Sequence, residues 1–173
     1  APPNAIITTD AGNMSTWVHR HWIMTPRNTL LGAIAGAMGF GVPAAVSAGL
    51  ADDTRMAIAF VGDGGALMTG QELATAMQYG AKTKIVISDN GIYGTIRTYQ
   101  ARLYPNRVSG TDLANPDFTA WAKSFGALVV SIALGDDVDA KVKEFLSHDG
   151  AAVLHVKSSK EALSAFTTLS ALG

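Results

Sequence analysis

Short runs of almost uninterrupted apolar residues alternate with segments of helical spacing along most of this sequence. The clearest runs are residues 56–61, 84–88, 128–132 and 152–156, and residues 6–9 form a shorter, β-rich one. Helices are expected over residues 40–50, 69–79 and 138–146, and through Trp121 to Phe125. Strands that are apolar on both faces are typical of a parallel sheet covered on both sides. The predicted fold class is therefore α/β, a parallel sheet with helices on both faces.

Polar loops containing glycine or asparagine follow three of the predicted strands, at residues 10–13, 62–65 and 89–91. In a parallel sheet the carboxyl ends of the strands meet at one edge, and ligands bind beyond that edge. These three loops are therefore expected to form one site.

The loop Gly62-Asp63-Gly64-Gly65 follows an apolar strand and precedes a helix. Glycines allow a phosphate to approach the backbone, and a helix N-terminus offers it free N–H groups. Asp63 suits such a site only if a cation neutralises both charges, and Mg²⁺ takes oxygen ligands from carboxylates and diphosphates. Asn90, at the end of the next strand, supplies a second oxygen ligand. The alternative is that Asp63 merely caps the helix that follows.

Several motifs, in order, resemble the thiamine-diphosphate enzymes, and among them the acetolactate synthases and related 2-oxo-acid decarboxylases. Gly62-Asp63-Gly64 followed by Asp89-Asn90 is similar to the family signature GDG…NN. Further similar stretches are residues 36–45, 62–76, 93–97, 115–118 and 125–127. The resemblance covers nearly the whole chain and implies its C-terminal, diphosphate-binding domain.

The resemblance implies a role for each matching position. Asp63, Asn90 and the carbonyl of Ile92 correspond to the protein ligands of Mg²⁺. Met38 resembles the residue that bends the cofactor into a V, and the Gly36 carbonyl resembles the acceptor for its pyrimidine amino group. The full set of implied cofactor-binding positions is Asn13, Met14, Gly36, Met38, Gly62, Asp63, Gly64, Gly65, Ala66, Asn90, Ile92, Tyr93 and Gly94.

The sequence departs from the family pattern at three positions. Asp89 replaces the first asparagine of the pair, Met14 stands where many acetolactate synthases carry histidine, and Ile92 is bulkier than usual. The glutamate that activates the cofactor's pyrimidine ring lies on a separate pyrimidine domain in this family. No catalytic residue is therefore expected on this chain, and Glu72 is interpreted as structural.

Charge and cysteine content exclude several classes of function. The net charge is −1, with 13 Lys and Arg against 14 Asp and Glu, and no basic run is present. Nucleic-acid and anionic-membrane binding are therefore not expected. The absence of cysteine excludes thiolate chemistry and disulfides and is compatible with the expected cytoplasmic location.

The uncharged segment Leu30 to Ala51 has the length of a membrane span. Its five glycines, Pro43 and many alanines favour a buried, close-packed loop and helix instead. The family resemblance implies a homodimer, and this Ala- and Gly-rich helix suits close packing between copies of the chain.

Several other residues have simpler interpretations. His19 and His21 suggest a strand or loop, and a zinc site there lacks a further ligand nearby. Asp136, Asp137 and Asp139 are typical of a helix start. Tyr93, Arg97 and Tyr99 form either a gate or a solvated face. The Ala- and Ser-rich tail from Ser158 has moderate helical character.

These observations predict one domain over residues 1–173 that binds thiamine diphosphate and Mg²⁺. Because the sequence starts Ala1-Pro2-Pro3, without methionine, it is interpreted as a fragment or a processed or trimmed chain, and the resemblance implies the C-terminal part of a longer protein. The predicted chemistry is decarboxylation or carboligation of a small 2-oxo acid. Two alternatives stay open: a two-chain decarboxylase whose other subunit brings the pyrimidine domain, and a non-catalytic phosphate- or nucleotide-binding module.

Overall fold

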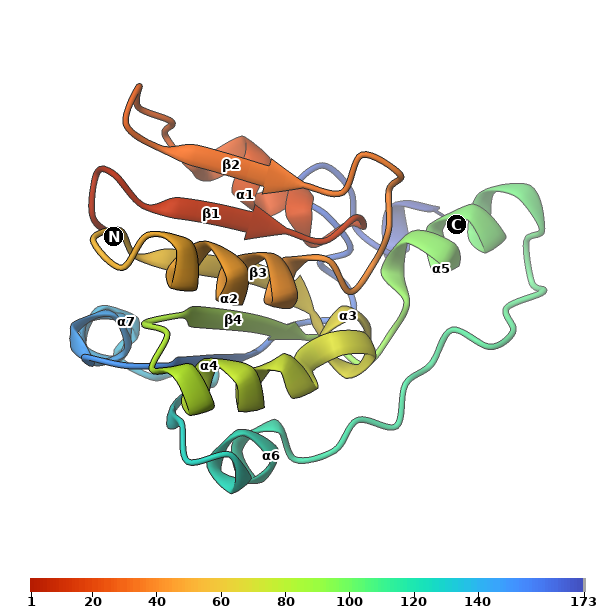
Figure 1. Cartoon of the computed structure of the whole chain (residues 1–173). Coiled ribbons are helices and arrows are strands. Elements are labelled where there is room, and N and C mark those ends of the chain that lie inside the picture. The colour runs from red at the N-terminus through yellow and green to blue at the C-terminus, as the bar shows by residue number, and fades with distance from the viewer. Residues whose placement is uncertain (173) are drawn as a thin grey trace.

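The protein is built around one six-stranded sheet in the order β2-β1-β3-β4-β6-β5 (Figure 1). The structure is a computed structural model that describes residues 1–172. Every strand pair is parallel, with Ile7 opposite both Leu30 and Ile58 and with Val86 opposite Leu154. The strands are β1 (Ile6–Thr9), β2 (Thr29–Gly32), β3 (Ala57–Gly62), β4 (Lys84–Asp89), β5 (Leu128–Ile132) and β6 (Ala152–Lys157).

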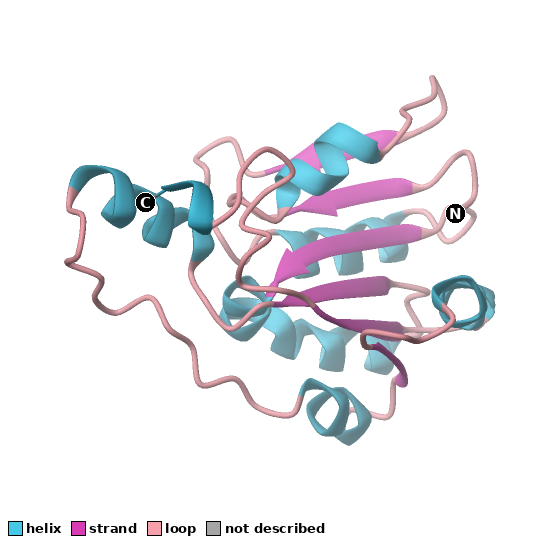
Figure 2. Ribbon diagram, turned by 180° about the vertical axis from the view of Figure 1, so that it is seen from behind, coloured by secondary structure: helices cyan, strands magenta, loops and turns pink. Residues whose placement is uncertain are grey.

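Helices cover both faces of the sheet, which confirms the predicted fold class (Figures 1 and 2). One apolar core joins α2, α4 and α6 to one face, and a second core joins α1 and α7 to the other. The helices are α1 (Ser15–His21), α2 (Gly41–Ala51), α3 (Asp63–Thr69), α4 (Leu73–Tyr79), α5 (Gly94–Leu103), α6 (Phe118–Ser124) and α7 (Val138–Ser147), with 3-10 turns at Gly70–Glu72 and Ser170–Leu172.

Three helix ends carry residues that are typical of helix caps. The Asp117 carboxylate accepts from two backbone N–H groups of α6, and the Asp137 carboxylate accepts from the Ala140 N–H in α7. Gly80 ends α4 in the left-handed conformation, with φ of 69°. The helix start expected at Asp136, Asp137 and Asp139 is therefore confirmed.

The predicted loop at residues 62–65 is wrong, because α3 begins at Asp63 directly after the extended Gly62. Gly64 and Gly65 have ordinary negative φ and are needed for space instead. A Cβ on Gly64 would lie closer than 3.0 Å to the Tyr93 ring. A Cβ on Gly65 would likewise lie closer than 3.0 Å to an oxygen of the Asp10 carboxylate. These glycines therefore allow the segments that follow β1 and β4, the two strands on either side of β3, to approach α3.

The helix predicted over residues 69–79 is divided in the structure. It consists of the end of α3, a 3-10 turn at Gly70–Glu72, and α4. Gly70 faces the Trp121 ring, where a Cβ would lie 2.8 Å from the indole Cη2. Close packing against α6 therefore accompanies the irregular turn.

The expectation that residues 30–51 are a buried loop and helix is only half right. Helix α2 buries Val42 and Val46, but the preceding segment forms the edge strand β2 and an exposed connection. Leu30 is 41% exposed and Ile34 is fully exposed. Sequence reasoning missed β2 because it has only four residues and no β-branched run beyond Thr29. In residues 1–172, no helix is long and apolar enough to cross a membrane.

Two further segments differ from the sequence-based expectation. His19 and His21 lie on the short helix α1, not on a strand or loop, because Val18 turns inward and the hydroxyls of Ser15 and Thr16 bond to the preceding turn. The tail from Ser158 is irregular except for its 3-10 turn at Ser170–Leu172. Its hydroxyl groups bond to nearby backbone N–H groups, which competes with helix formation.

Lys84 is a buried cation at the amino end of β4, opposite the predicted site. Its Nζ donates to the carbonyls of His148 and Gly150, each at 2.7 Å, and burial lowers its pKa to about 8 from 10.5. A neutral amine still has the two N–H groups that these two carbonyls accept. Between about pH 8 and 10.5 the folded chain has released this proton while the unfolded chain holds it, so stability from this group rises with pH in that window.

Urea unfolding at pH 8 and pH 10 measures this effect against Lys84→Met. Relative to this variant, the wild type is expected to gain about 1 kcal/mol per pH unit. Lys82→Met is the matched control, because Lys82 is exposed and its ion pair with Asp149 raises its pKa, so no gain arises from it. Parallel stability curves for the wild type and Lys84→Met would contradict the prediction.

Candidate functional site

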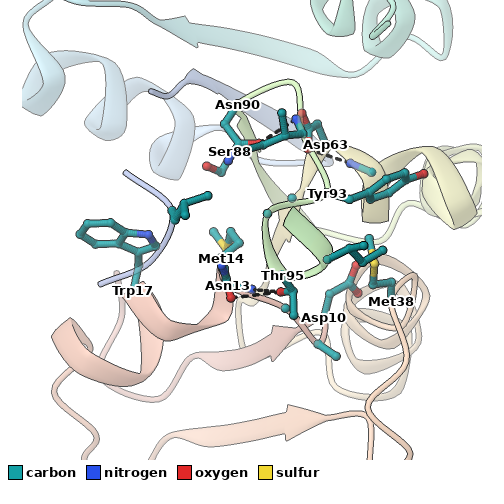
Figure 3. Close-up of a pocket in the computed structure, with 18 of the residues that line it drawn as sticks. Asp10, Asn13, Met14, Trp17, Met38, Asp63, Ser88, Asn90, Tyr93 and Thr95 are labelled. Atoms are coloured by element: carbon teal, nitrogen blue, oxygen red, sulfur yellow. Dashed lines mark hydrogen bonds between the residues drawn. The ribbon is translucent and has the colours of Figure 1, made fainter. Parts of the chain in front are cut away.

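The carboxyl ends of β1, β3 and β4 meet around one small pocket of about 70 Å³ (Figure 3). This confirms that the loops after these three strands come together at one edge. The C-terminal tail closes part of the pocket with Ala162 and Leu163. Ten predicted positions line the pocket, namely Asn13, Met14, Met38, Gly62, Asp63, Gly64, Asn90, Ile92, Tyr93 and Gly94.

Three predicted positions do not line this pocket. Gly36 is exposed in the connection after β2 and has φ of 67°. Gly65 is buried against Asp10, and Ala66 is 1% exposed within the apolar core. The Ala66 methyl group therefore packs in the core.

Asp63 is the buried carboxylate of the site, only 3% exposed. Its Oδ1 accepts from the Gly64 N–H at 2.9 Å, and its Oδ2 accepts from the Gly91 N–H at 2.6 Å and from Asn115 Nδ2 at 2.7 Å. Burial raises the pKa of Asp63, although these hydrogen bonds oppose the rise. Within residues 1–172, no Lys, Arg or His forms an ion pair with it. The site thus contains a buried acid that lacks a cationic partner among these residues.

The turn after β4 brings Asn90 and Ile92 beside Asp63. Asn90 Oδ1 accepts from the Ile92 N–H at 3.1 Å, and the Gly91 N–H between them is the one that binds Asp63. Figure 3 shows Asn90 and Asp63 next to each other at one end of the pocket. The Asp63 carboxylate and the Asn90 amide oxygen therefore lie at the same end of the pocket, and both are oxygen ligands of the kind that Mg²⁺ takes.

The carboxylate cluster around Asp63 includes a second acid that the sequence reasoning did not assign. Asp89 Oδ2 accepts from His155 Nε2 at 2.9 Å and from Lys157 Nζ at 2.8 Å, while Oδ1 accepts from Asn115 Nδ2 at 2.8 Å. Burial alone would raise the pKa of Asp89, but these three hydrogen bonds outweigh it and hold the pKa below its ordinary value. The departure from the family asparagine at this position is thus accommodated by hydrogen bonds from the Lys157 ammonium and the His155 ring.

The opposite end of the pocket is held by Asn13 and Thr95. The Asn13 N–H donates to Thr95 Oγ1 at 2.9 Å, and Thr95 Oγ1 donates back to Asn13 Oδ1 at 3.1 Å. Asn13 Nδ2 donates to Thr98 Oγ1 at 3.2 Å. Figure 3 shows Met14 beside this pair and facing the pocket. The Asn13 side chain therefore ties the loop after β1 to helix α5.

Asp10 was not singled out in the sequence, and the structure gives it a central position. It is 6% exposed, and its two oxygens accept from the N–H groups of Gly39 and Gly41. Gly41 is the first residue of α2, so Asp10 caps that helix from a neighbouring strand. Its signal in the sequence was an acid placed directly after a buried strand.

In residues 1–172, no group of three or more His, Asp or Glu side chains is placed to hold a metal ion. The ring of His21 stacks on Trp17. Asp63 is more than a helix cap, because only its Oδ1 accepts from the first turn of α3, while its Oδ2 accepts from Gly91 and Asn115.

A parallel α/β sheet with a buried carboxylate, an amide and a glycine-lined helix start at its carboxyl edge defines the class of cofactor-binding α/β domains. Residues 10–156 match the family described as "Thiamine pyrophosphate enzyme, C-terminal TPP binding domain". The chain belongs to this family, which confirms the resemblance seen in the sequence.

Individual relatives agree with this assignment. The chain is 40% identical over 154 residues to the acetolactate synthase large subunit of Parasynechococcus marenigrum, covering 88% of this chain and 24% of the relative. It is 34% identical over 159 residues to the mitochondrial acetolactate synthase catalytic subunit of Saccharomyces cerevisiae, covering 91% and 23%. It is 40% identical over 144 residues to the probable acetolactate synthase large subunit of Methanocaldococcus jannaschii, covering 82% of this chain and 24% of the relative. The chain thus spans about a quarter of the length of these relatives.

Proposed function

We propose that this chain binds the diphosphate of thiamine diphosphate through Mg²⁺, as one part of an acetolactate synthase-like enzyme acting on 2-oxo acids. Asp63, the Asn90 side chain and the Ile92 carbonyl are the proposed metal ligands. The observation that carries the proposal is the Asp63 carboxylate, buried without a cationic partner among the described residues and hydrogen-bonded to the turn that carries the other two ligands. A divalent cation would offset the cost of burying that charge.

In this proposal, the chain binds the cofactor, and a residue outside the chain activates it. Thiamine diphosphate supplies an electron sink for breaking or forming the bond next to the substrate carbonyl. Met38 lines the pocket as the proposed residue that bends the cofactor, and Tyr93 closes the side next to Gly64. The activating glutamate is proposed to come from a pyrimidine domain, on the same longer chain or on a separate subunit.

Exposed apolar residues support the proposal of a partner domain or a second copy. Ile23 is 88% exposed, and Leu30 and Ile34 extend the apolar surface along β2 and the connection that follows it. Exposed apolar patches of this kind are typical of protein interfaces. The number of copies, the substrate and the cytoplasmic location stay predictions.

Thermal unfolding of the chain with thiamine diphosphate and Mg²⁺ tests the proposal. A ligand at 100 times its Kd adds about 2.7 kcal/mol, which corresponds to about 5–10 °C in a domain of this size. This rise is expected to disappear with a chelator and in Asp63→Asn, which keeps the size of the side chain but removes its charge. Asp137→Asn is the matched control, since Asp137 caps α7 and asparagine caps equally well.

The outcome also separates the alternative functions. ATP with Mg²⁺ is measured in parallel, because a nucleotide-binding module would respond to it and not to thiamine diphosphate. A response to ATP alone, or a thiamine diphosphate response that Asp63→Asn retains in full, would contradict the proposed site.

A further inference from the structure

Asn115 connects two buried carboxylates that lie on neighbouring strands. Its Nδ2 donates to Asp63 Oδ2 at 2.7 Å and to Asp89 Oδ1 at 2.8 Å. Asp63 follows β3 and Asp89 ends β4, while Asn115 lies before α6 and comes from a different part of the chain. One side-chain amide therefore uses both of its N–H bonds to hold two acids at a fixed separation.

The chemistry of the two carboxylates fixes the orientation of the Asn115 amide. Turning the amide over would place its oxygen against two carboxylate oxygens and lose both hydrogen bonds. In the observed orientation, Asn115 Oδ1 is buried and has no hydrogen-bond partner among residues 1–172. An unpaired buried carbonyl costs about 1–3 kcal/mol, so the two hydrogen bonds to the carboxylates must outweigh this cost.

Asp89 is itself anchored on its other side. His155 and Lys157 donate to its Oδ2, and His155 Nδ1 lies 3.4 Å from Ser131 Oγ on β5. A continuous chain of polar contacts thus runs from β5 across β6 and β4 to Asn115 and Asp63. The end of this chain at Asp63 is also held by the Gly91 N–H.

We propose that Asn115 is a positioning residue for the Mg²⁺-binding carboxylate of Asp63, anchored from behind by Asp89. Two donors fix Asp63 Oδ2, whereas Oδ1 accepts only from the Gly64 N–H and keeps a lone pair for a cation. Mg²⁺ needs near-ideal octahedral geometry, so it is sensitive to how firmly a ligand is oriented. This inference rests on the proposed function and assigns to it a residue outside the metal ligands.

The test is a Mg²⁺ titration of the thermal shift at saturating thiamine diphosphate. In Asn115→Ala the Mg²⁺ concentration for half-maximal stabilisation is expected to rise about 10- to 100-fold, as for other residues that orient metal ligands. Asn115→Gln, which keeps both N–H groups on a longer side chain, is expected to recover part of this loss. The same titration with Ca²⁺ is expected to change less, because Ca²⁺ accepts flexible geometry.

Asn28→Ala is the matched control for a merely structural asparagine. Asn28 Nδ2 also donates to two acceptors, the carbonyls of Pro3 and Ala5, but it lies just before β2, at the amino edge of the sheet and away from the pocket. This variant is expected to lower the melting temperature without moving the Mg²⁺ midpoint.

Two different results would overturn the inference, and they are distinguishable. A wild-type midpoint retained in Asn115→Ala would refute the positioning role while leaving the proposed function intact. A wild-type chain without any Mg²⁺-dependent response would refute the proposed function and, with it, the inference. If Asn115→Ala does not fold, the midpoint in Asn115→Gln decides: it must lie above that of the wild type.

Discussion

Gly65→Ala is expected to destabilise the chain by about 3 kcal/mol or more, although alanine is ordinarily the better helix residue by about 1 kcal/mol. Gly65 lies in the first turn of α3, where an added Cβ would overlap the Asp10 carboxylate. Asp10 cannot move aside without releasing the N–H groups of Gly39 and Gly41, and each buried N–H left unpaired costs about 1–3 kcal/mol. Chemical denaturation measures the loss.

Gly62→Ala is the matched control for this prediction. Gly62 is extended, with φ of −79° and ψ of 165°, and an added Cβ would meet only the Met14 Cβ, at 3.9 Å. The expected loss is about 1 kcal/mol or less, as for a helix N-cap changed from glycine to alanine. Equal losses in the two variants would show that backbone preference, and not the contact with Asp10, determines the effect.

The glycines of this site show how far sequence reasoning reaches. Their clustering after an apolar strand predicted the position of the site, because glycine is common both in turns and near phosphates. It did not predict that Asp63 already begins a helix, since glycine composition gives the same signal for a turn and for close packing. The distinction depends on Tyr93 and Asp10, which arrive from other strands and which no local window contains.

The placement of the two proposed metal ligands at one edge of the sheet followed from the sequence, whereas the residues that support them were not predicted. Asp63 and Asn90 each come directly after a strand, so a parallel sheet brings them to one edge. Asn115 is 52 positions from Asp63, and His155 is 66 positions from Asp89. Nothing in the local pattern of these residues distinguishes them from an ordinary loop asparagine and strand histidine. Their role depends on tertiary packing alone.

The same limit explains the missed edge strand and the tail. β2 pairs with β1 on one side only, and its side chains alternate between partly buried and exposed. Its four residues therefore lack the continuous apolar character that marked the inner strands. In the tail, Leu163 is 2% exposed and closes the pocket without belonging to a helix or strand. Periodicity detects neither kind of segment.

Asp10→Ala is expected to destabilise the chain by about 2–5 kcal/mol, because it leaves two buried backbone N–H groups without an acceptor. One of these, on Gly41, begins α2, where a carboxylate also interacts favourably with the helix dipole. Asp10→Asn is expected to lose less, since its one amide oxygen still serves one of the two groups. Amide hydrogen exchange should therefore accelerate at both Gly39 and Gly41 in Asp10→Ala, and at one of them in Asp10→Asn.

The contact between Asp10 and Gly65 allows a stringent check by a double-mutant cycle. Once Asp10→Ala has removed the carboxylate, the methyl group added by Gly65→Ala meets no obstacle there. The free energy of unfolding lost in the double variant is therefore expected to be smaller than the sum of the two single losses by at least about 1 kcal/mol, as for residues in direct contact. Strict additivity would mean that the two residues act independently. The Asp10 carboxylate, which caps α2, would then not be the group that prevents a side chain at Gly65.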